Sequence, residues 1–221
     1  MTANPHTRSA RGSRRRHDPA RDARRAARKE ELLAGAIRVI RRDGPLASMD
    51  AIAAEAGVTK PIVYRHFGDR DGLTQAVAAQ FAGELFAELR GALAGSDEPE
   101  QVLRTTIDAY LAFIERDPQI YRFVVQSPPT PSSDGLTLAG FVRQVGQEVA
   151  VVLGERMRQV GADSGAAEPW AFGIVGMVHL AGDWWLERRA MPRARLVDYL
   201  TALLWNGMGA ADRVPEEGAR G

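Results

Sequence analysis

The chain has 221 residues, enough to bury a sizeable core either as one large domain or as a small domain joined to a larger one. It contains no cysteine, which excludes disulfides and thiolate metal sites. No apolar run approaches the roughly 18 residues of a membrane span, and the basic N-terminus lacks the apolar segment of a secretory signal. We therefore expect a soluble, cytoplasmic protein with no membrane partner.

The near-neutral net charge of +1 conceals a strong asymmetry along the chain. Residues 1–75 carry 16 Lys and Arg against 9 Asp and Glu, whereas the remaining 146 residues carry 13 against 19. Charge separated in this way indicates a part that binds a polyanion, attached to an acidic body with a different task.

The N-terminal residues 1–22 are predicted to form a basic disordered arm. Residues 1–17 are rich in Arg, Ser, Thr and Gly and have almost no apolar side chain. Ten Lys and Arg lie in residues 1–29 against two acids, Asp18 and Asp22. We expect the arm to add electrostatic affinity for a polyanion without reading a sequence; the alternative is a solubilising tail.

A helix is predicted from about Arg24 to Asp43, because apolar side chains recur there at helical spacing, and Asp18-Pro19 offers an earlier start. Gly44-Pro45 then ends this helix. The apolar positions are Leu33, Ala36, Ile37 and Ile40.

Residues 48–70, with the sequence SMDAIAAEAGVTKPIVYRHFGDR, predict two short helices joined by a tight turn. Gly57 is expected to take a positive φ at the turn, which glycine adopts without steric cost. Thr59 is placed to cap the second helix, and Pro61 is tolerated in its first turn because the missing N–H has no helical partner there. A helix-turn-helix needs this arrangement to lay its second helix in the major groove of DNA.

The same stretch resembles the DNA-binding domain of TetR-family transcriptional regulators. The motif is the run Ala53-x-x-Ala56-Gly57-Val58-Thr59-Lys60-Pro61-x-Val63-Tyr64-Arg65-His66-Phe67, followed by Arg70 and Leu73. Arg70 departs from the family pattern, in which lysine is usual, but keeps the positive charge. The rest of the chain matches the family only in length, helicity and element spacing.

The resemblance implies an all-α fold with a DNA-binding end and a sensing body. The helix-turn-helix DNA-binding domain would span residues 23–70, and a helical ligand-binding and dimerisation domain residues 71–211, followed by a flexible tail over residues 212–221. The partners would be a double-stranded DNA operator, a small-molecule effector and a second copy of the chain.

Two groups of side chains would contact DNA if the resemblance holds. Lys60, Pro61 and Arg65 would face base edges. The residues that would hold phosphates are Ser48, Thr59, Tyr64, His66 and Arg70. Each side chain alone is equally compatible with ordinary surface or packing, and the joint pattern carries the prediction.

The remaining chain predicts further helices and no convincing strand. The segment YRFVV is apolar and β-branched, but it follows a cap and a proline and is predicted to be helical, whereas SPPTPSSDG is predicted to be a loop. The expected helices run over about residues 69–93, 98–116, 118–126, 135–160 and 168–189, and a last helix follows the break at Met191-Pro192 and ends at about Ala210.

The middle helices carry aromatic and aliphatic side chains that suit a pocket for an apolar ligand, with Tyr110 or Gln144 setting its orientation. The alternative for each position is ordinary core. The pocket candidates are Phe81, Leu85, Tyr110, Phe113, Ile114, Tyr121, Phe141, Gln144 and Trp170.

His179 lies in the apolar run GIVGMVHLAGDWW, where a lone histidine is more often a hydrogen-bonded core or interface group than a metal ligand. The other three histidines lie in the arm or the helix-turn-helix and cannot easily join it. We therefore expect no metal site and no cofactor.

The last two predicted helices have the character of a dimer surface, with small residues for close approach and large apolar anchors. Two such helices per subunit would meet across a two-fold axis; the alternative is packing inside the monomer. The candidates are Gly176, Trp184, Leu196, Tyr199, Leu200 and Leu203.

The resemblance implies a repressor that a small hydrophobic ligand releases from a palindromic operator. The alternatives are an activator, a DNA-binding protein without a ligand, or an all-helical enzyme. The sequence offers no Gly-rich phosphate loop and no nucleophile with a nearby base, so no enzymatic activity is predicted.

Overall fold

The computed structural model describes residues 19–93, 95–96, 98–125 and 138–211, and every regular element in these ranges is a helix. The all-α prediction is thus confirmed. The elements are α1 (Pro19–Asp43), the 3-10 turn η1 (Gly44–Leu46), α2 (Met49–Glu55), α3 (Lys60–Phe67), α4 (Arg70–Leu93), α5 (Pro99–Arg116), α6 (Pro118–Val125), α7 (Leu138–Gln159), the 3-10 turn η2 (Ser164–Ala166), α8 (Ala167–Arg188) and α9 (Arg193–Ala211).

One expected boundary differs from the structure. Helix α1 begins at Pro19, so residues 19–22 belong to its first turn and not to the arm. The segment YRFVV lies in α6, as predicted. Residues 1–17, the loop SPPTPSSDG and the tail from residue 212 lie outside the described residues. None of the described helices is long and apolar enough to cross a membrane.

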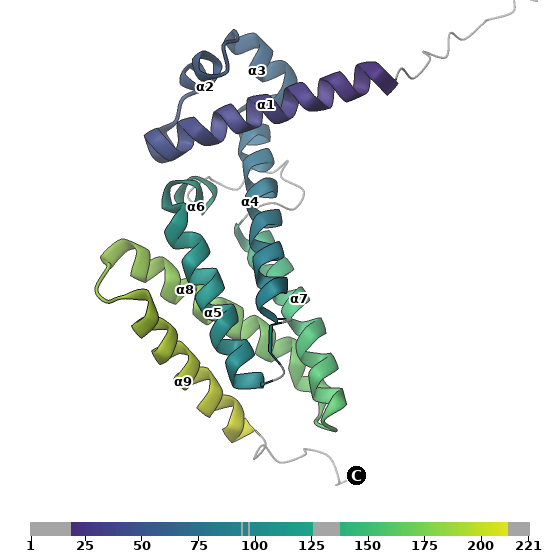
Figure 1. Ribbon diagram of the computed structural model, residues 1–221, viewed down its shortest axis with the longest axis vertical. Coiled ribbons are helices and arrows are strands. Elements are labelled where there is room, and N and C mark those ends of the chain that lie inside the picture. Colours follow the sequence, from purple (N-terminus) through teal and green to yellow (C-terminus); the bar gives the residue numbers. More distant parts are fainter. Residues whose placement is uncertain (1–18, 94, 97, 126–137, 212–221) are drawn as a thin grey trace, which may run out of the picture.

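Helices α1, α2 and α3 form a small unit at one end of the molecule (Figure 1). Ser48 caps α2, because its Oγ accepts a hydrogen bond from the amide of Ala51 at 3.1 Å. Gly57 makes the turn with a φ of +62°, as predicted. The fully buried side chains that fill this unit are Leu32, Val39, Ile40, Ile52 and Val63.

Thr59 lies at the N-cap position of α3, but its hydroxyl makes no capping hydrogen bond. The predicted N-cap position of Thr59 is therefore confirmed, and the predicted capping by its side chain is wrong. Pro61 lies in the first turn of α3, as expected.

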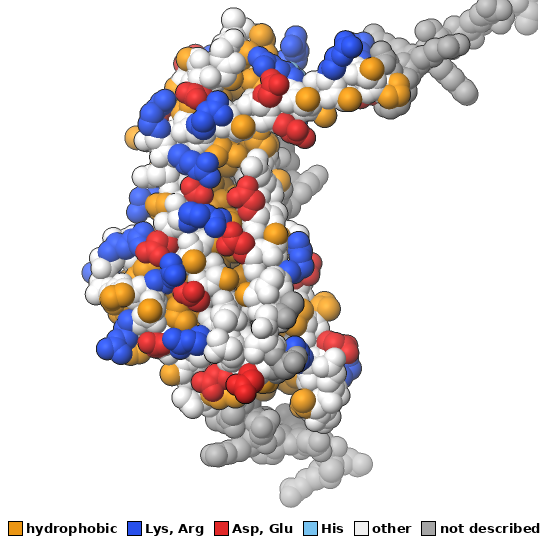
Figure 2. Space-filling view, viewed as in Figure 1, with side chains coloured by type: hydrophobic (Ala, Val, Ile, Leu, Met, Phe, Trp, Pro, Cys, Tyr) orange, Lys and Arg blue, Asp and Glu red, His pale blue; other side chains and the backbone are white. Residues whose placement is uncertain are grey.

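The body is built around α4, which runs from the small unit into the lower part of the molecule (Figure 1). Helix α5 packs against both α4 and α9, and α7 and α8 pack on each other as an antiparallel hairpin. This hairpin is tight because small residues face it: a Cβ at Gly146 would lie 3.1 Å from the Phe172 ring. Acidic and basic side chains are interspersed over the face of the body seen in Figure 2.

Helix α6 joins the two parts, because it packs against α1, η1 and α4. At its N-terminus Asp117 receives two hydrogen bonds from the Arg41 guanidinium of α1, at 2.8 and 3.0 Å. Farther along α6, the Arg70 guanidinium lies 5.7 Å from the centre of the Phe123 ring. The position of α6 is thus tied to the helices around the helix-turn-helix.

Candidate nucleic-acid interface and ligand cavity

The predicted DNA-binding side chains gather on the outer face of α3 and the turn before it. Val63 and Phe67 point into the core, which leaves Pro61 and Arg65 exposed and Tyr64 with 38% of its surface exposed. Thr59 and Ser48 are also exposed, each at the start of a helix. Exposed side chains one helical turn apart on one short helix are what major-groove reading requires.

Lys60 is the one predicted base-reading side chain that already holds a partner. Its Nζ lies 2.9 Å from Oδ2 of Asp50, an exposed residue in the first turn of α2. The hydrogen bond to Asp50 raises the pKa of Lys60. The lysine is therefore held between α2 and α3 when no DNA is bound.

Arg70 is placed differently from the phosphate contact predicted for it. Its guanidinium donates hydrogen bonds to the carbonyl oxygens of Ala47 at 2.7 Å and of Pro45 at 2.9 Å. These bonds fix the start of α4 against the segment that leads into α2. Arg70 thus has a structural role that the sequence pattern did not indicate.

His66 lies on the side of α3 that faces α1, and it is half-buried. Burial, and then the positive charges of Arg65 and of Arg25, Arg28 and Lys29 on α1, lower the pKa of His66. From the sequence, these three α1 residues were predicted only to be part of the basic N-terminal segment. Their helical phase places them beside α3, and that placement extends the basic surface next to the predicted reading helix.

A cavity of about 910 Å³ lies in the body between the α7–α8 hairpin and helices α4, α5 and α9. Its lining is mostly aliphatic. Helix α7 contributes a periodic face that includes Val142, Val145, Val149, Val152, Leu153, Arg156 and Met157. The α5 contribution includes Val102, Leu103, Thr106, Ile107 and Tyr110. A pocket of this size and character fits a small apolar or amphipathic molecule.

Two of the nine predicted pocket residues, Tyr110 and Trp170, line this cavity. Five others are buried outside its lining: Phe81, Leu85, Phe113, Ile114 and Tyr121. Gln144 is exposed on α7, and the side chain of Phe141 lies outside the described part of the chain. The valine face of α7 was missed, although its spacing of three and four residues was a readable signal.

His179 of α8 also lines the cavity, where it is hydrogen-bonded as the sequence suggested. Its Nδ1 lies 3.0 Å from the Tyr110 hydroxyl of α5 and 3.4 Å from the Tyr121 hydroxyl of α6. Burial lowers the pKa of His179, which favours the neutral imidazole, and burial raises the pKa of both tyrosines. His179 therefore places a polar group in a mostly apolar wall of the cavity.

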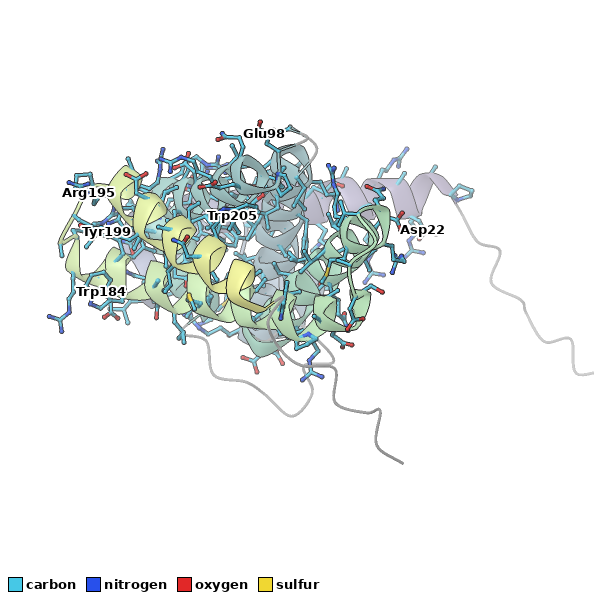
Figure 3. All side chains as sticks on the ribbon, turned by 90° about the horizontal axis from the view of Figure 1, so that it is seen from below. Asp22, Glu98, Trp184, Arg195, Tyr199 and Trp205 are labelled. Atoms are coloured by element: carbon cyan, nitrogen blue, oxygen red, sulfur yellow. The ribbon has the colours of Figure 1, made fainter. Side chains whose placement is uncertain are left out.

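Helices α8 and α9 carry large apolar side chains on an outer face that nothing in the described chain covers. Met177, Leu180 and Trp184 of α8 are 39%, 69% and 41% exposed, and Tyr199 and Leu203 of α9 are 56% and 59% exposed. Trp184 and Tyr199 lie at the same edge of the body (Figure 3). Several large apolar side chains exposed on neighbouring positions of two helices are typical of a protein interface.

The six predicted dimer residues divide between this face and the core. Trp184, Tyr199 and Leu203 belong to the face, and a Cβ at Gly176 would meet no atom within 4 Å. Leu196 and Leu200 are 5% and 6% exposed, so they pack inside the monomer.

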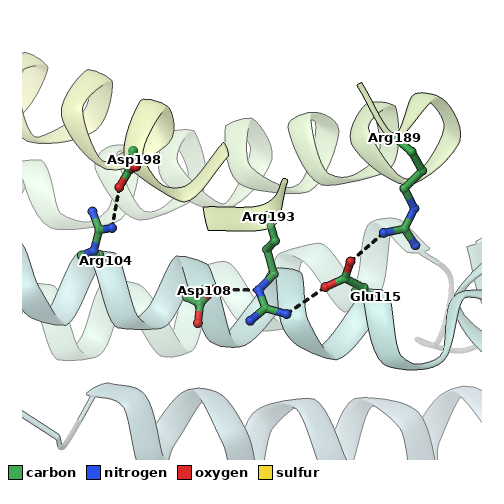
Figure 4. A network of polar contacts seen from close by, with 6 residues as sticks. All are labelled: Arg104, Asp108, Glu115, Arg189, Arg193 and Asp198. Atoms are coloured by element: carbon green, nitrogen blue, oxygen red, sulfur yellow. Dashed lines mark hydrogen bonds and ion pairs between the residues drawn. The ribbon is translucent and has the colours of Figure 1, made fainter. Parts of the chain in front are cut away.

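An ion-pair network holds the α8–α9 turn and α9 against α5 (Figure 4). Arg193 bonds both Asp108 and Glu115 at 2.8 Å, and Arg189 bonds Glu115 at 2.8 Å. Arg104 and Asp198 form a further pair. The network fixes the relative placement of the two helices that form the exposed face.

Two family models match the chain. Residues 32–77 match the family described as bacterial regulatory proteins of the tetR family, and residues 88–220 match the tetracyclin repressor-like C-terminal domain. Together they cover both the helix-turn-helix and the body.

Similar proteins are found among curated sequences and solved structures. An uncharacterized HTH-type transcriptional regulator of Mycobacterium tuberculosis is 38% identical over 182 residues, which are 82% of this chain and 77% of that protein. The HTH-type transcriptional activator FasR of Mycolicibacterium smegmatis is 29% identical over 206 residues, 91% and 90% of the two chains. A tetR-family regulator from Streptomyces coelicolor has the same fold, with a TM-score of 0.65, 21% identity and 86% of each chain covered.

Proposed function

Because the chain belongs to the TetR family of transcriptional regulators, we propose that it binds a palindromic DNA operator as a homodimer and that an apolar ligand in the cavity releases it. The single observation that carries the ligand-controlled part is the cavity of about 910 Å³ in a body tied through α6 to the DNA-binding unit. The exposed outer face of α3 carries the DNA-binding part.

Sequence reading is proposed for Arg65, with Lys60 and Pro61 beside it. Arg65 is exposed and has no ion-pair partner among the described residues, so its guanidinium is available for the O6 and N7 acceptors of guanine. Thr59, Tyr64 and Ser48 are proposed to hold phosphates, and the exposed hydroxyl of Thr59, which does not cap α3, is available for that task.

The test of DNA reading is capture of genomic DNA fragments by the purified protein, followed by sequencing. We expect enrichment of one palindromic site and loss of that enrichment in Arg65→Ala, with a cost of about 1–3 kcal/mol in operator affinity. Arg90→Ala, which removes an exposed arginine from the far end of α4, is the matched control and should bind like the parent. Salt-sensitive binding without a preferred sequence would contradict specific regulation.

Dimerisation is proposed through the exposed apolar face of α8 and α9. To bind a palindrome, a two-fold pairing there has to bring the two α3 helices to about 34–36 Å from each other, one turn of DNA. Leu203→Glu is expected to yield monomers in sedimentation velocity and to reduce operator affinity. Val151→Glu puts the same charge at a residue of α7 that is 69% exposed, and it should leave the assembly unchanged.

Control by ligand is proposed to act through α6 and α4. Tyr121 of α6 contacts His179 at the cavity, and Asp117 of the same helix holds Arg41 of α1. A ligand that favours one placement of α6 would therefore change the spacing of the two α3 helices, and it can shift this equilibrium only by its difference in affinity for the two shapes.

The direction of control has a second candidate, activation, because FasR is named an activator. A reporter fused to the captured operator separates the two. Loss of the protein raises transcription if it represses and lowers transcription if it activates.

A further inference from the structure

At one end of the cavity, Tyr110, Tyr121, His179 and Asp183 form a polar cluster. The hydrogen bonds within this cluster leave one N–H donor of His179 without a partner in the described chain. Tyr121, which is 3% exposed, lies within hydrogen-bonding reach of the Asp183 carboxylate and of Tyr110. A carboxylate only accepts, so the Tyr121 hydroxyl donates to Asp183. The Tyr110 hydroxyl lies 3.0 Å from Nδ1 of His179, and we assign it as the donor of this bond because a phenol is a stronger acid than the N–H of a neutral imidazole.

These bonds fix the tautomer of His179. A neutral imidazole that accepts at Nδ1 carries its proton on Nε2, so Nε2–H is a donor. Among the residues that the structure describes, Nε2 has no hydrogen-bond partner. Helix α8 lies close to α5 here, since a Cβ at Gly182 would lie 3.2 Å from Cε1 of Tyr110, and this packing places the Tyr110 side chain beside α8.

A second polar atom along the same wall also lacks a partner. Thr106 lies one helical turn before Tyr110 on α5, and it lines the cavity. Its buried hydroxyl has no hydrogen-bond partner in the described chain. This oxygen is itself buried away from the cavity, so it is not available to a ligand, and Nε2 of His179 remains the donor on this wall that a ligand can use.

The charged residues near His179 determine which polar group of a ligand can be buried beside it. Arg156 is the cationic residue of the lining, and it belongs to the opposite end, where α7 meets the start of α8 and Gly154 packs on Ala167. Next to His179 stands the acid Asp183, one turn later on α8. A carboxylate buried here would have no cation to pair with and would face a like charge.

We propose that His179 recognises an uncharged oxygen acceptor, such as a carbonyl, on an elongated and otherwise apolar ligand. The acceptor takes the Nε2–H hydrogen bond, Tyr110 holds the imidazole ring through Nδ1, and the apolar part of the ligand lies along the valine face of α7. This inference rests on the proposed ligand-binding function and names the class of ligand.

The test uses matched probes and the fluorescence of Trp170 and Trp205, which line the cavity. The probes are a ten-carbon methyl ketone, the alkene in which CH2 replaces its carbonyl oxygen, and the ten-carbon carboxylic acid and amine. In His179→Phe we expect the ketone-to-alkene affinity ratio to fall about threefold to tenfold, the worth of one neutral hydrogen bond, while alkene affinity stays within about twofold. Tyr110→Phe removes one hydroxyl oxygen and should lower the ketone-to-alkene affinity ratio less. Val149→Ala should change the affinities for the ketone and for the alkene by the same factor.

The outcomes separate this inference from the wider proposal. If His179→Phe and Tyr110→Phe change ketone and alkene binding equally, the cavity binds ligands but His179 does not recognise an oxygen, and the inference is overturned. Tightest binding of the acid or of the amine to the parent protein overturns it as well. If no probe binds the parent protein while operator binding persists, both the inference and the proposed ligand control fail. Should His179→Phe not fold, Tyr110→Phe alone decides.

Discussion

The two ends of the molecule are packed in opposite ways. In the DNA-binding unit, side chains from three helices fill the centre, and Leu32, Ile52 and Val63 are fully buried. In the body, α8 packs closely on α5 at Gly182, but farther along the α7–α8 hairpin a cavity of about 910 Å³ lies between it and α4, α5 and α9. Protein interiors are normally close-packed, so the contrast is between a filled DNA-binding unit and a body with room for the ligand that we propose.

The largest expected effect tests this contrast through two leucines. Leu32→Ala removes a fully buried side chain from the filled unit and should lower the free energy of unfolding by about 2–5 kcal/mol, because it opens a new cavity. Leu103→Ala trims a half-buried side chain that already borders a cavity, so only about 1 kcal/mol should be lost.

Urea denaturation of both variants provides the measurement. Equal losses would mean that the body is as closely packed as the DNA-binding unit, and the cavity would then not persist in solution.

The DNA-binding unit was predictable because its signals are local. Gly57 needs its positive φ, Ser48 caps the helix that follows it, and Val63 and Phe67 mark the inner face of α3 within a few residues of the exposed Arg65. Each signal depends on neighbours in the sequence. The exception is Arg70, whose partners Pro45 and Ala47 lie more than twenty positions away.

The cavity was only partly predictable because its lining depends on how far apart helices stand. Phe113 and Tyr110 lie three positions apart on α5, yet Tyr110 borders the space and Phe113 packs 4.5 Å, centre to centre, from the ring of Phe81. Hydrophobic spacing identifies both as inward-facing and cannot tell a filled interior from an empty one. The same limit applies to Leu200 and Leu203, of which one is core and the other surface.

A smaller effect is expected where the two ends meet. Arg41→Gln removes the paired hydrogen bonds to Asp117 that tie α6 to α1. Operator affinity without ligand should change little, since Arg41 lies away from the outer face of α3. The factor by which a bound ketone probe weakens operator binding should shrink about threefold to tenfold, because less of the movement of α6 reaches α1.

Fluorescence anisotropy of labelled operator, measured with and without the probe, gives this factor. Arg158→Gln, which removes an exposed ion pair with Glu155 within α7, is the matched control. An unchanged factor in Arg41→Gln would place the coupling elsewhere, in α4 itself.

The smallest effect concerns the reading surface alone. Asp50 holds Lys60 at 2.9 Å and is itself 73% exposed, so it places a negative charge beside the proposed DNA contact. Asp50→Asn should raise affinity for nonspecific DNA roughly twofold to fivefold, the range expected for one exposed ion pair, because Lys60 is released and repulsion from phosphate is relieved. Affinity for the operator should rise less, since base contacts depend on where Lys60 is held, and the ratio of specific to nonspecific affinity should therefore fall.

Anisotropy titrations with the operator and with a scrambled duplex, at one fixed salt concentration, measure both values, and Glu148→Gln on α7 controls for the change in net charge. A lower affinity for both duplexes would show instead that Asp50 supports the DNA-bound shape of α2 and α3, and the ion pair would then belong to the fold and not to the discrimination between sequences.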